Sequence, residues 1–141
     1  MKLNFKLSEV FLLHEIVIRL DRLARQTILE ERGVTYQEFL VMMSARELPT
    51  PTQDDVAQYL DISRSSVSQR VSSLLEKQLV LQVQDKSNRR KVNLSLTPQG
   101  AELLSEIYSL MLGATEEVFA SLGPQREPFQ QALLQIIRLL E

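Results

Sequence analysis

Residues 63–98 read SRSSVSQRVSSLLEKQLVLQVQDKSNRRKVNLSLTP, and the fold is predicted mainly from the pattern of these residues. In its first part apolar residues recur every three or four positions, which is the period of a helix with one buried face. The expected buried stripe consists of Val67, Val71, Leu74 and Leu75. After Lys77 the period shortens to two on both sides of a polar, basic loop, which predicts a two-stranded hairpin with one apolar face. That face would consist of Leu79, Leu81, Val83, Val92, Leu94 and Leu96.

A second helix is predicted directly before this one. Thr52 followed by Asp55 is an N-terminal cap signal, since such side chains accept backbone N–H groups that a helix start leaves unpaired. A tight turn at 61–63 follows, and Ser63 with Ser66 can cap the next helix. Two helices joined by so short a turn form a helix-turn-helix. Because an isolated hairpin is only marginally stable in water, the predicted hairpin must pack on these helices, which gives a winged helix.

Further helices are predicted on both sides of the winged helix. Thr35 and Glu38 fit a capping box that opens a helix to Glu47. Helical periodicity also covers the segment from Ser8 to about Glu31, with Gly33 placed to end it. Thr97 can cap a helix that runs from Pro98 to the break at Gly123 and Pro124, and a last helix is expected at 128–141.

The terminal helices are apolar around much of their circumference, which in water implies burial on more than one side. Two chains that associate through these ends would cover this surface, and a two-fold dimer is the commonest solution. We therefore expect residues 1–34 and 98–141 to form a helical dimerisation region and residues 35–97 to form a winged helix-turn-helix DNA-binding domain. The alternative is a monomer whose terminal helices fold back on its own winged helix. In either case the fold class is mainly α with a two-stranded β-hairpin wing.

Composition excludes several classes of protein. The chain has 141 residues, 44% of them apolar, which suits one compact domain or two small ones. It has no cysteine and a single histidine, His14, so we expect no thiolate metal site, no redox sensor, no catalytic triad and no bound cofactor. It also lacks a glycine-rich phosphate loop, so enzymatic activity is not expected. No stretch has the roughly 20 apolar residues of a membrane span, and no signal peptide is evident at the start, so we expect a cytoplasmic protein.

The formal charge of −2 conceals an uneven distribution. Residues 62–91 hold seven basic and two acidic residues, a net charge of +5, whereas the other residues hold nine basic and sixteen acidic ones, a net charge of −7. A cationic segment in an otherwise acidic chain is typical either of a polyanion-binding surface or of a solvated face.

Residue chemistry in this segment favours DNA. Arginine can donate two hydrogen bonds to guanine, and Gln69 can pair with adenine through two hydrogen bonds. In a dimer, two recognition helices would enter major grooves about one helical turn apart on a pseudo-palindromic operator. Arg89 and Arg90 at the wing tip could enter a narrow minor groove, while Lys86 and Lys91 would neutralise phosphates. The expected DNA-binding residues are Ser63, Arg64, Ser65, Ser66, Ser68, Gln69 and Arg70 in the helix and Lys86, Arg89, Arg90 and Lys91 in the wing.

The order of elements and several motifs resemble the MarR family of bacterial transcription regulators over nearly the whole chain. The most specific motifs are Thr52-Gln53, Val56-Ala57, the run 63–70, Leu74-Leu75-Glu76-Lys77, Asp85 through Arg90, and Leu96-Thr97-Pro98-Gln99-Gly100. The chain departs from the family at Asn88, where the wing motif has a second aspartate. It also departs at Gln78, where glycine is common, and at Gln82, where an arginine often stands. These departures bear on operator affinity rather than on the fold.

The resemblance implies an obligate homodimer that binds palindromic DNA, usually as a repressor, and that often releases DNA when a small aromatic ligand binds. For such a ligand, His14, Arg22, Arg46 and Tyr36 are conceivable contacts, but each also suits an ordinary surface or core position, so we assign no ligand site. A second interpretation remains open at this point. In it, the winged helix acts through a protein partner and its basic face no longer contacts DNA.

Overall fold

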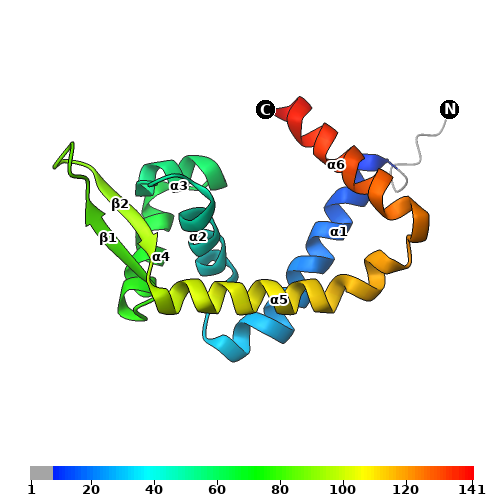
Figure 1. Ribbon diagram of the computed structural model, residues 1–141, viewed down its shortest axis with the longest axis horizontal. Coiled ribbons are helices and arrows are strands. Elements are labelled where there is room, and N and C mark those ends of the chain that lie inside the picture. Colours follow the sequence, from blue (N-terminus) through cyan, green and yellow to red (C-terminus); the bar gives the residue numbers. More distant parts are fainter. Residues whose placement is uncertain (1–7) are drawn as a thin grey trace. The chain divides into compact units, whose positions relative to one another are not determined.

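The computed structural model describes residues 8–141 (Figure 1). The chain divides into two compact units, one that ends at Ile107 and one from Tyr108 to Glu141, and each is described by itself. The first seven residues of the expected dimerisation region lie outside the described residues.

The first unit begins with α1 (Glu9–Ala24). Ser8 caps this helix by accepting a hydrogen bond from the backbone N–H of Phe11. The chain continues through a π-helical turn, η2 (Arg25–Leu29), and a 3-10 turn, η3 (Glu30–Arg32). It leaves the helix at Gly33, whose φ of 64° is a left-handed conformation that glycine adopts without strain. The helix predicted from Ser8 to Glu31 is therefore confirmed, with its last turns wound differently.

The winged helix follows in the predicted order. Its elements are α2 (Tyr36–Glu47), α3 (Gln53–Leu60), α4 (Arg64–Glu76), β1 (Val80–Gln84) and β2 (Val92–Leu96). Both predicted capping boxes form, one between Thr35 and Glu38 and one between Thr52 and Asp55. Ser63 caps α4 by accepting from the backbone N–H of Ser66 at 3.1 Å.

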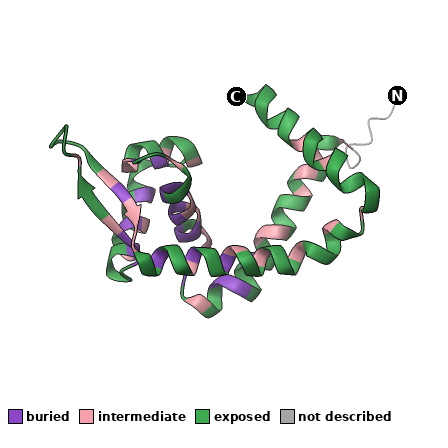
Figure 2. Cartoon of the chain, in the orientation of Figure 1, coloured by how far each residue is buried: buried purple, intermediate pink, exposed green. Residues whose placement is uncertain are grey.

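The core of this unit lies between α2, α3, α4, the hairpin and the start of α5 (Pro98–Ala120) (Figure 2). Its most deeply buried side chains include Val41, Met42, Val56, Val67, Val71, Leu74, Leu94, Leu104 and Ile107. Leu75, which was expected in the buried stripe of α4, is 36% exposed. It follows Leu74 directly and therefore lies about 100° further around the helix.

The hairpin does not have the single apolar face that the alternation predicted. In the antiparallel register Leu81 lies opposite Ser95 and Leu94 lies opposite Gln82. Directly opposite residues share a face of the sheet, so the apolar positions of the two strands lie on opposite faces. The inner face carries Leu94, which is 1% exposed, while Val83 on the other face is 48% exposed. The wing is thus attached through β2 and the start of β1, and its outer half is solvated.

Two backbone features join the hairpin to its neighbouring helices. Gln78 has a φ of 58°, the left-handed conformation, which explains why glycine would suit this position. At the same end of the hairpin, directly after β2, Thr97 donates its hydroxyl to the Gln78 carbonyl at 2.7 Å and accepts from the backbone N–H of Gly100 at 2.9 Å. A Cβ on Gly100 would lie 1.9 Å from the carbonyl oxygen of Leu79, so α5 starts in direct contact with the entry to β1.

The second unit contains the end of α5, the 3-10 turn η4 (Gly123–Gln125) and α6 (Arg126–Leu140). The helix predicted at 128–141 therefore begins two residues earlier. Arg126 forms a two-pronged ion pair with Glu116, with N–O distances of 2.7 and 2.9 Å. None of the described residues from Tyr108 to Glu141 is buried.

Candidate nucleic-acid interface

The free side of α4 carries most of the residues predicted to read DNA. Five of the seven are exposed, and they are Ser63, Arg64, Ser65, Ser68 and Gln69. Ser66 and Arg70 are half-buried. The buried positions Val67, Val71 and Leu74 define the opposite side of the helix, so Gln69 lies near the centre of the outward face.

Arg70 lies at the edge of this face rather than at its centre. It shares one flank of α4 with Ser66, Ser73 and Lys77, because these residues are three or four positions apart. Ser73 and Lys77 contact Glu38 of α2, so this flank faces α2. The Nε of Arg70 is buried, and no described residue accepts a hydrogen bond from it. Its guanidinium is therefore less available to an outside ligand than the sequence pattern indicated.

Arg64 extends from the first turn of α4 to the first turn of α3. Its Nη1 contacts Asp54 Oδ1, and its Nε donates to Gln53 Oε1 at 3.3 Å. The side chains of Arg64 and Asp54 remain 55% and 73% exposed. No pattern in the sequence predicts this pair.

The wing loop is organised by Asp85. One of its carboxylate oxygens accepts from the hydroxyl and the backbone N–H of Ser87 and from the backbone N–H of Asn88, and the other accepts from the Asn93 amide. These hydrogen bonds, those from Ser87 first, hold the pKa of Asp85 well below its usual range. Asn88 in turn accepts from the backbone N–H of Arg90 at 3.2 Å. Because that contact needs only an oxygen acceptor, Asn88 can serve this turn in place of an aspartate.

The four basic wing residues, Lys86, Arg89, Arg90 and Lys91, are all exposed. Only backbone atoms of Arg89 and Arg90 take part in the hydrogen bonds that hold the loop, at 2.6 and 3.2 Å. Within residues 8–141, no carboxylate lies in ion-pair contact with any of the four. The wing tip thus presents a concentrated positive charge to solvent.

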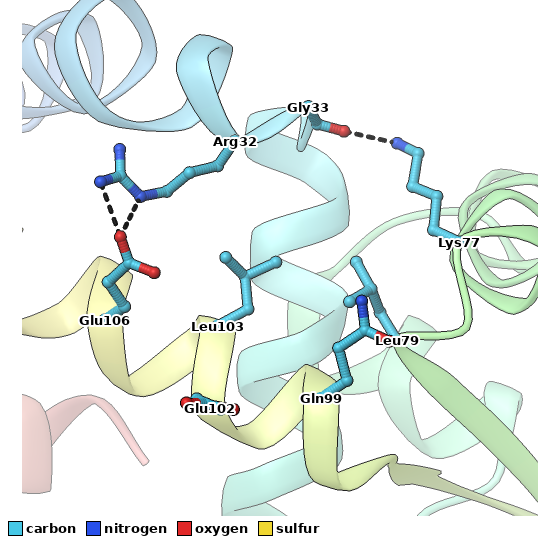
Figure 3. A pocket seen from close by; sticks show the side chains of 8 residues that line it. All are labelled: Arg32, Gly33, Lys77, Leu79, Gln99, Glu102, Leu103 and Glu106. Carbon is cyan, nitrogen blue, oxygen red and sulfur yellow. Dashed lines mark hydrogen bonds and ion pairs between the residues drawn. The ribbon is translucent and has the colours of Figure 1, made fainter.

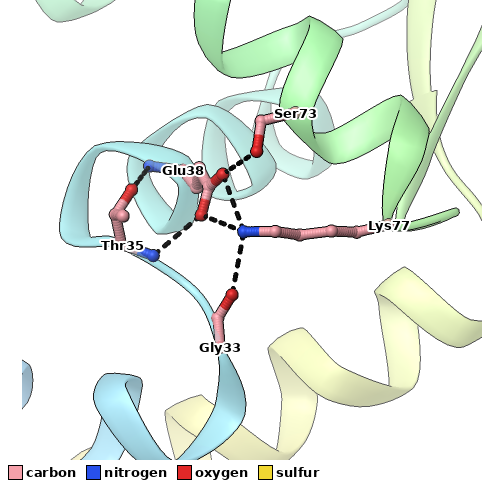
Figure 4. A network of polar contacts seen from close by, with 5 residues as sticks. All are labelled: Gly33, Thr35, Glu38, Ser73 and Lys77. Atoms are coloured by element: carbon pink, nitrogen blue, oxygen red, sulfur yellow. Dashed lines mark hydrogen bonds and ion pairs between the residues drawn. The ribbon is translucent and has the colours of Figure 1, made fainter.

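A buried network fixes α4 against α2 (Figure 4). Glu38 is 3% exposed, and its carboxylate accepts from Lys77 Nζ at 2.8 and 2.9 Å, from the Ser73 hydroxyl at 2.5 Å and from the Thr35 backbone N–H at 2.8 Å. Lys77 Nζ also donates to the Gly33 carbonyl at 2.8 Å. Burial alone would raise the pKa of Glu38, but the hydrogen bonds from Lys77, Ser73 and Thr35 outweigh it and lower that pKa.

Two cavities lie near the ends of α2 and α4. One, of about 460 Å³, has Leu79 and Leu103 on its walls and the ion pair of Arg32 with Glu106 at its rim, at N–O distances of 2.8 and 2.9 Å (Figure 3). Its second cation, Lys77, is already engaged by Glu38.

The other cavity, of about 450 Å³, has Leu29 and Val34 as apolar lining. Its polar lining consists of Arg25, Glu30, Thr35, Tyr36 and Gln37. The Arg25 guanidinium lies 5.8 Å from the centre of the Tyr36 ring. Burial, reinforced by Asp21, raises the pKa of Tyr36 to about 12, so its hydroxyl stays protonated.

Of the four conceivable ligand contacts in the sequence, only Tyr36 lines one of these two cavities. His14 and Arg22 are exposed, and Arg46 is bonded to Glu47 at 2.9 Å. Arg25, which sequence reasoning missed, provides the cation beside Tyr36. Within the part of the chain that the structure describes, no group of His, Asp or Glu side chains could hold a metal ion, and no helix has the length and apolar character needed to cross a membrane.

Comparison with known proteins supports the assignment of the fold. Residues 34–92 match the model of the MarR family. The matched region contains α2, α3, α4 and the hairpin up to Val92, so the resemblance to this family rests on the winged helix. A putative transcriptional regulatory protein for the hcr operon of Thauera aromatica is 28% identical over 98 residues, which are 70% of this chain and 59% of that protein's length. The match therefore spans somewhat more than half of that relative.

Solved structures of regulators share the fold along almost the whole chain. MarR of E. coli in its apo form has a TM-score of 0.78 at 20% identity, with 93% of this chain and 97% of that chain covered. MepR of S. aureus in complex with DNA has a TM-score of 0.75 at 21% identity, with 98% and 99% covered. BpsR of Bordetella bronchiseptica, whose DNA binding is regulated by 6-hydroxynicotinic acid, has a TM-score of 0.76 at 25% identity, with 98% of each chain covered. The winged helix-turn-helix fold predicted from the sequence is thus confirmed.

Proposed function

We propose that this chain is a homodimeric, sequence-specific DNA-binding transcriptional regulator, and that it acts as a repressor. The observation that carries the proposal is the exposure of Arg64 and Gln69 on α4 together with four exposed basic residues on one wing. Base-reading side chains on a helix and unpaired cations on a neighbouring hairpin are the two kinds of contact that specific DNA binding requires. This role requires no catalytic centre.

Exposed apolar side chains support the dimer and its assignment to the terminal regions. In a single chain, Val10 and Val17 of α1 are 79% and 53% exposed, and Leu139 and Leu140 of α6 are 77% and 81% exposed. Apolar surface on this scale marks a protein interface. We therefore assign dimerisation to residues 1–34 and 98–141 and DNA binding to residues 35–97.

An effector can be accommodated in the cavity beside Tyr36. Its apolar lining, one guanidinium and one protonated hydroxyl suit a small aromatic acid. BpsR, a structural neighbour that responds to 6-hydroxynicotinic acid, is an example of such regulation. We propose that an aromatic acid bound here weakens DNA binding. Arg25→Ala should abolish that response without changing DNA affinity in the absence of the acid.

The proposal is tested by fluorescence anisotropy with the protein's own promoter region as the duplex, at several salt concentrations. Arg89→Ala with Arg90→Ala removes four cations per dimer, so the slope of log K against log salt should fall by about 3.6, since each phosphate contact contributes about 0.9. A matched variant, Arg22→Ala with Arg46→Ala, removes the same charge elsewhere and should leave the slope nearly unchanged. Equal slopes in the two variants would remove the wing from the DNA interface. Absence of binding to any duplex at low salt would favour a protein partner instead.

A further inference from the structure

The contact between the first turns of α3 and α4 fixes the arginine that begins the recognition helix. Arg64 is the first residue of α4, and Gln53 and Asp54 are the first two residues of α3. The Arg64 guanidinium uses its Nε for Gln53 and its Nη1 for Asp54. All three side chains lie at the surface or half-buried, so the contact is made where a bound duplex would lie.

Folding alone does not account for this pair. An exposed ion pair contributes little to stability, because water screens it and two long side chains must be ordered. What the pair does change is the orientation of Arg64. A guanidinium carries five N–H donors in one plane. With Nε engaged by Gln53 and one N–H of Nη1 by Asp54, three N–H donors remain, one on Nη1 and two on Nη2. Two nitrogens that still carry donors are what bidentate pairing with the O6 and N7 of guanine requires.

Asp54 also places a carboxylate on the DNA-facing side of an otherwise cationic surface. Near phosphates, a negative charge weakens binding to every duplex regardless of its sequence. The neighbouring Asp55 differs, since Thr52 engages its carboxylate within the capping box. Asp54 therefore lowers the affinity of the protein for DNA of any sequence.

We propose that Asp54 is a positioning residue for Arg64, one that increases discrimination at the base pair that Arg64 reads and decreases affinity for DNA of other sequence. This inference rests on the proposed DNA-binding function. The groove behind the pair, of about 240 Å³, is lined by Gln82 and Val92 of the hairpin as well as by Arg64 and Asp54. The hydrogen bonds of the Arg64 side chain that the structure shows within the described residues both go to α3, and none goes to the hairpin.

The test begins with a library of randomised duplexes, from which the wild-type homodimer selects its preferred site. Arg64→Ala identifies the base pair that Arg64 reads, because preference should be lost there alone. Anisotropy titrations then compare the selected duplex, the same duplex changed at that base pair, and a random duplex. Asp54→Asn should reduce discrimination at that base pair about tenfold, within the range that one bidentate contact provides, and should bind the random duplex more tightly than wild type.

Asp61→Asn is the matched control. Asp61 is an exposed carboxylate at the turn between α3 and α4, and its left-handed conformation, with φ of 52°, is one that asparagine tolerates. It should also strengthen binding to the random duplex, but it should leave discrimination unchanged. Identical discrimination by Asp54→Asn and Asp61→Asn would overturn the positioning role, as would an Arg64→Ala variant with unaltered preference. If the wild type selects no duplex, the proposed function itself fails, and the two failures are thus distinguishable.

Discussion

Replacement of Glu38 by alanine should lower the free energy of unfolding by about 3 kcal/mol at pH 7, since a charge-assisted hydrogen bond contributes about 1.5–3 kcal/mol and a helix cap about 1. The variant loses the contacts with Lys77 and Ser73 and half of the capping box at Thr35. Breaking a buried ion pair usually costs about 3–5 kcal/mol of unfolding free energy. We expect a value at the lower end of this range because the Lys77 side chain is 36% exposed and its ammonium can be hydrated once Glu38 is removed.

The effect of Glu38 should depend on pH. Its pKa is lowered in the folded protein below the ordinary value of 4.5, so the carboxylate stabilises the fold at pH values above 4.5. That contribution is lost as the pH falls through the lowered pKa. The difference in unfolding free energy between wild type and the isosteric Glu38→Gln should therefore be largest near neutral pH and should shrink progressively below pH 4.5.

Urea unfolding followed by circular dichroism, at fixed protein concentration, measures these differences. Glu47→Ala is the control, because Glu47 lies on the same helix in an exposed ion pair with Arg46 and should cost less than about 0.5 kcal/mol. A Glu38→Ala variant as stable as Glu47→Ala at pH 7 would refute the reasoning. The reasoning would also be refuted if the difference in unfolding free energy between wild type and Glu38→Gln did not decrease below pH 4.5.

Three further predictions concern the backbone and the ends of the chain. Gly100→Ala should lower the free energy of unfolding, measured with urea, by about 3 kcal/mol because the new Cβ would overlap the Leu79 carbonyl. The control Gly113→Ala has open space around the new Cβ and should stabilise α5 by up to about 1 kcal/mol. Equal effects of the two substitutions would contradict the close contact at Gly100. Gln78→Val should lower the free energy of unfolding by about 1–2 kcal/mol, whereas Gln78→Gly should not lower it, since φ is positive there and glycine adopts that conformation without strain. Truncation after Ser121 should weaken the dimer in light scattering, and full dimerisation of that fragment would exclude α6 from the interface.

Local signals in the sequence predicted most of the fold. The caps predicted at Thr35, Thr52, Ser63 and Thr97 all form, because capping depends on residues three positions apart. The prediction that the hairpin has a single apolar face was wrong. Strict alternation shows that residues share a face within one strand, but it does not show which residue of the other strand lies opposite.

The interface was predictable in part. Exposure of Gln69 follows from the helical period, because the buried residues fix the opposite side of α4. The contact of Glu38 with Lys77 joins residues 39 positions apart, and the contact of Arg64 with Asp54 crosses a turn. Such pairs depend on how helices pack, and no short-range pattern encodes them. Arg70 illustrates the same limit, since its polarity favoured the outward face while packing against α2 placed it at the edge.

The lack of any buried side chain from Tyr108 to Glu141 has a consequence for how much protein a cell must make. A segment without a core of its own derives its stability from whatever covers it, so in the proposed dimer its order depends on mass action. Its melting temperature should then rise with protein concentration. At low protein concentration these helices would unfold first, whereas the winged helix, which has its own core, would remain folded. A single winged helix would then bind an operator of two half-sites with low affinity.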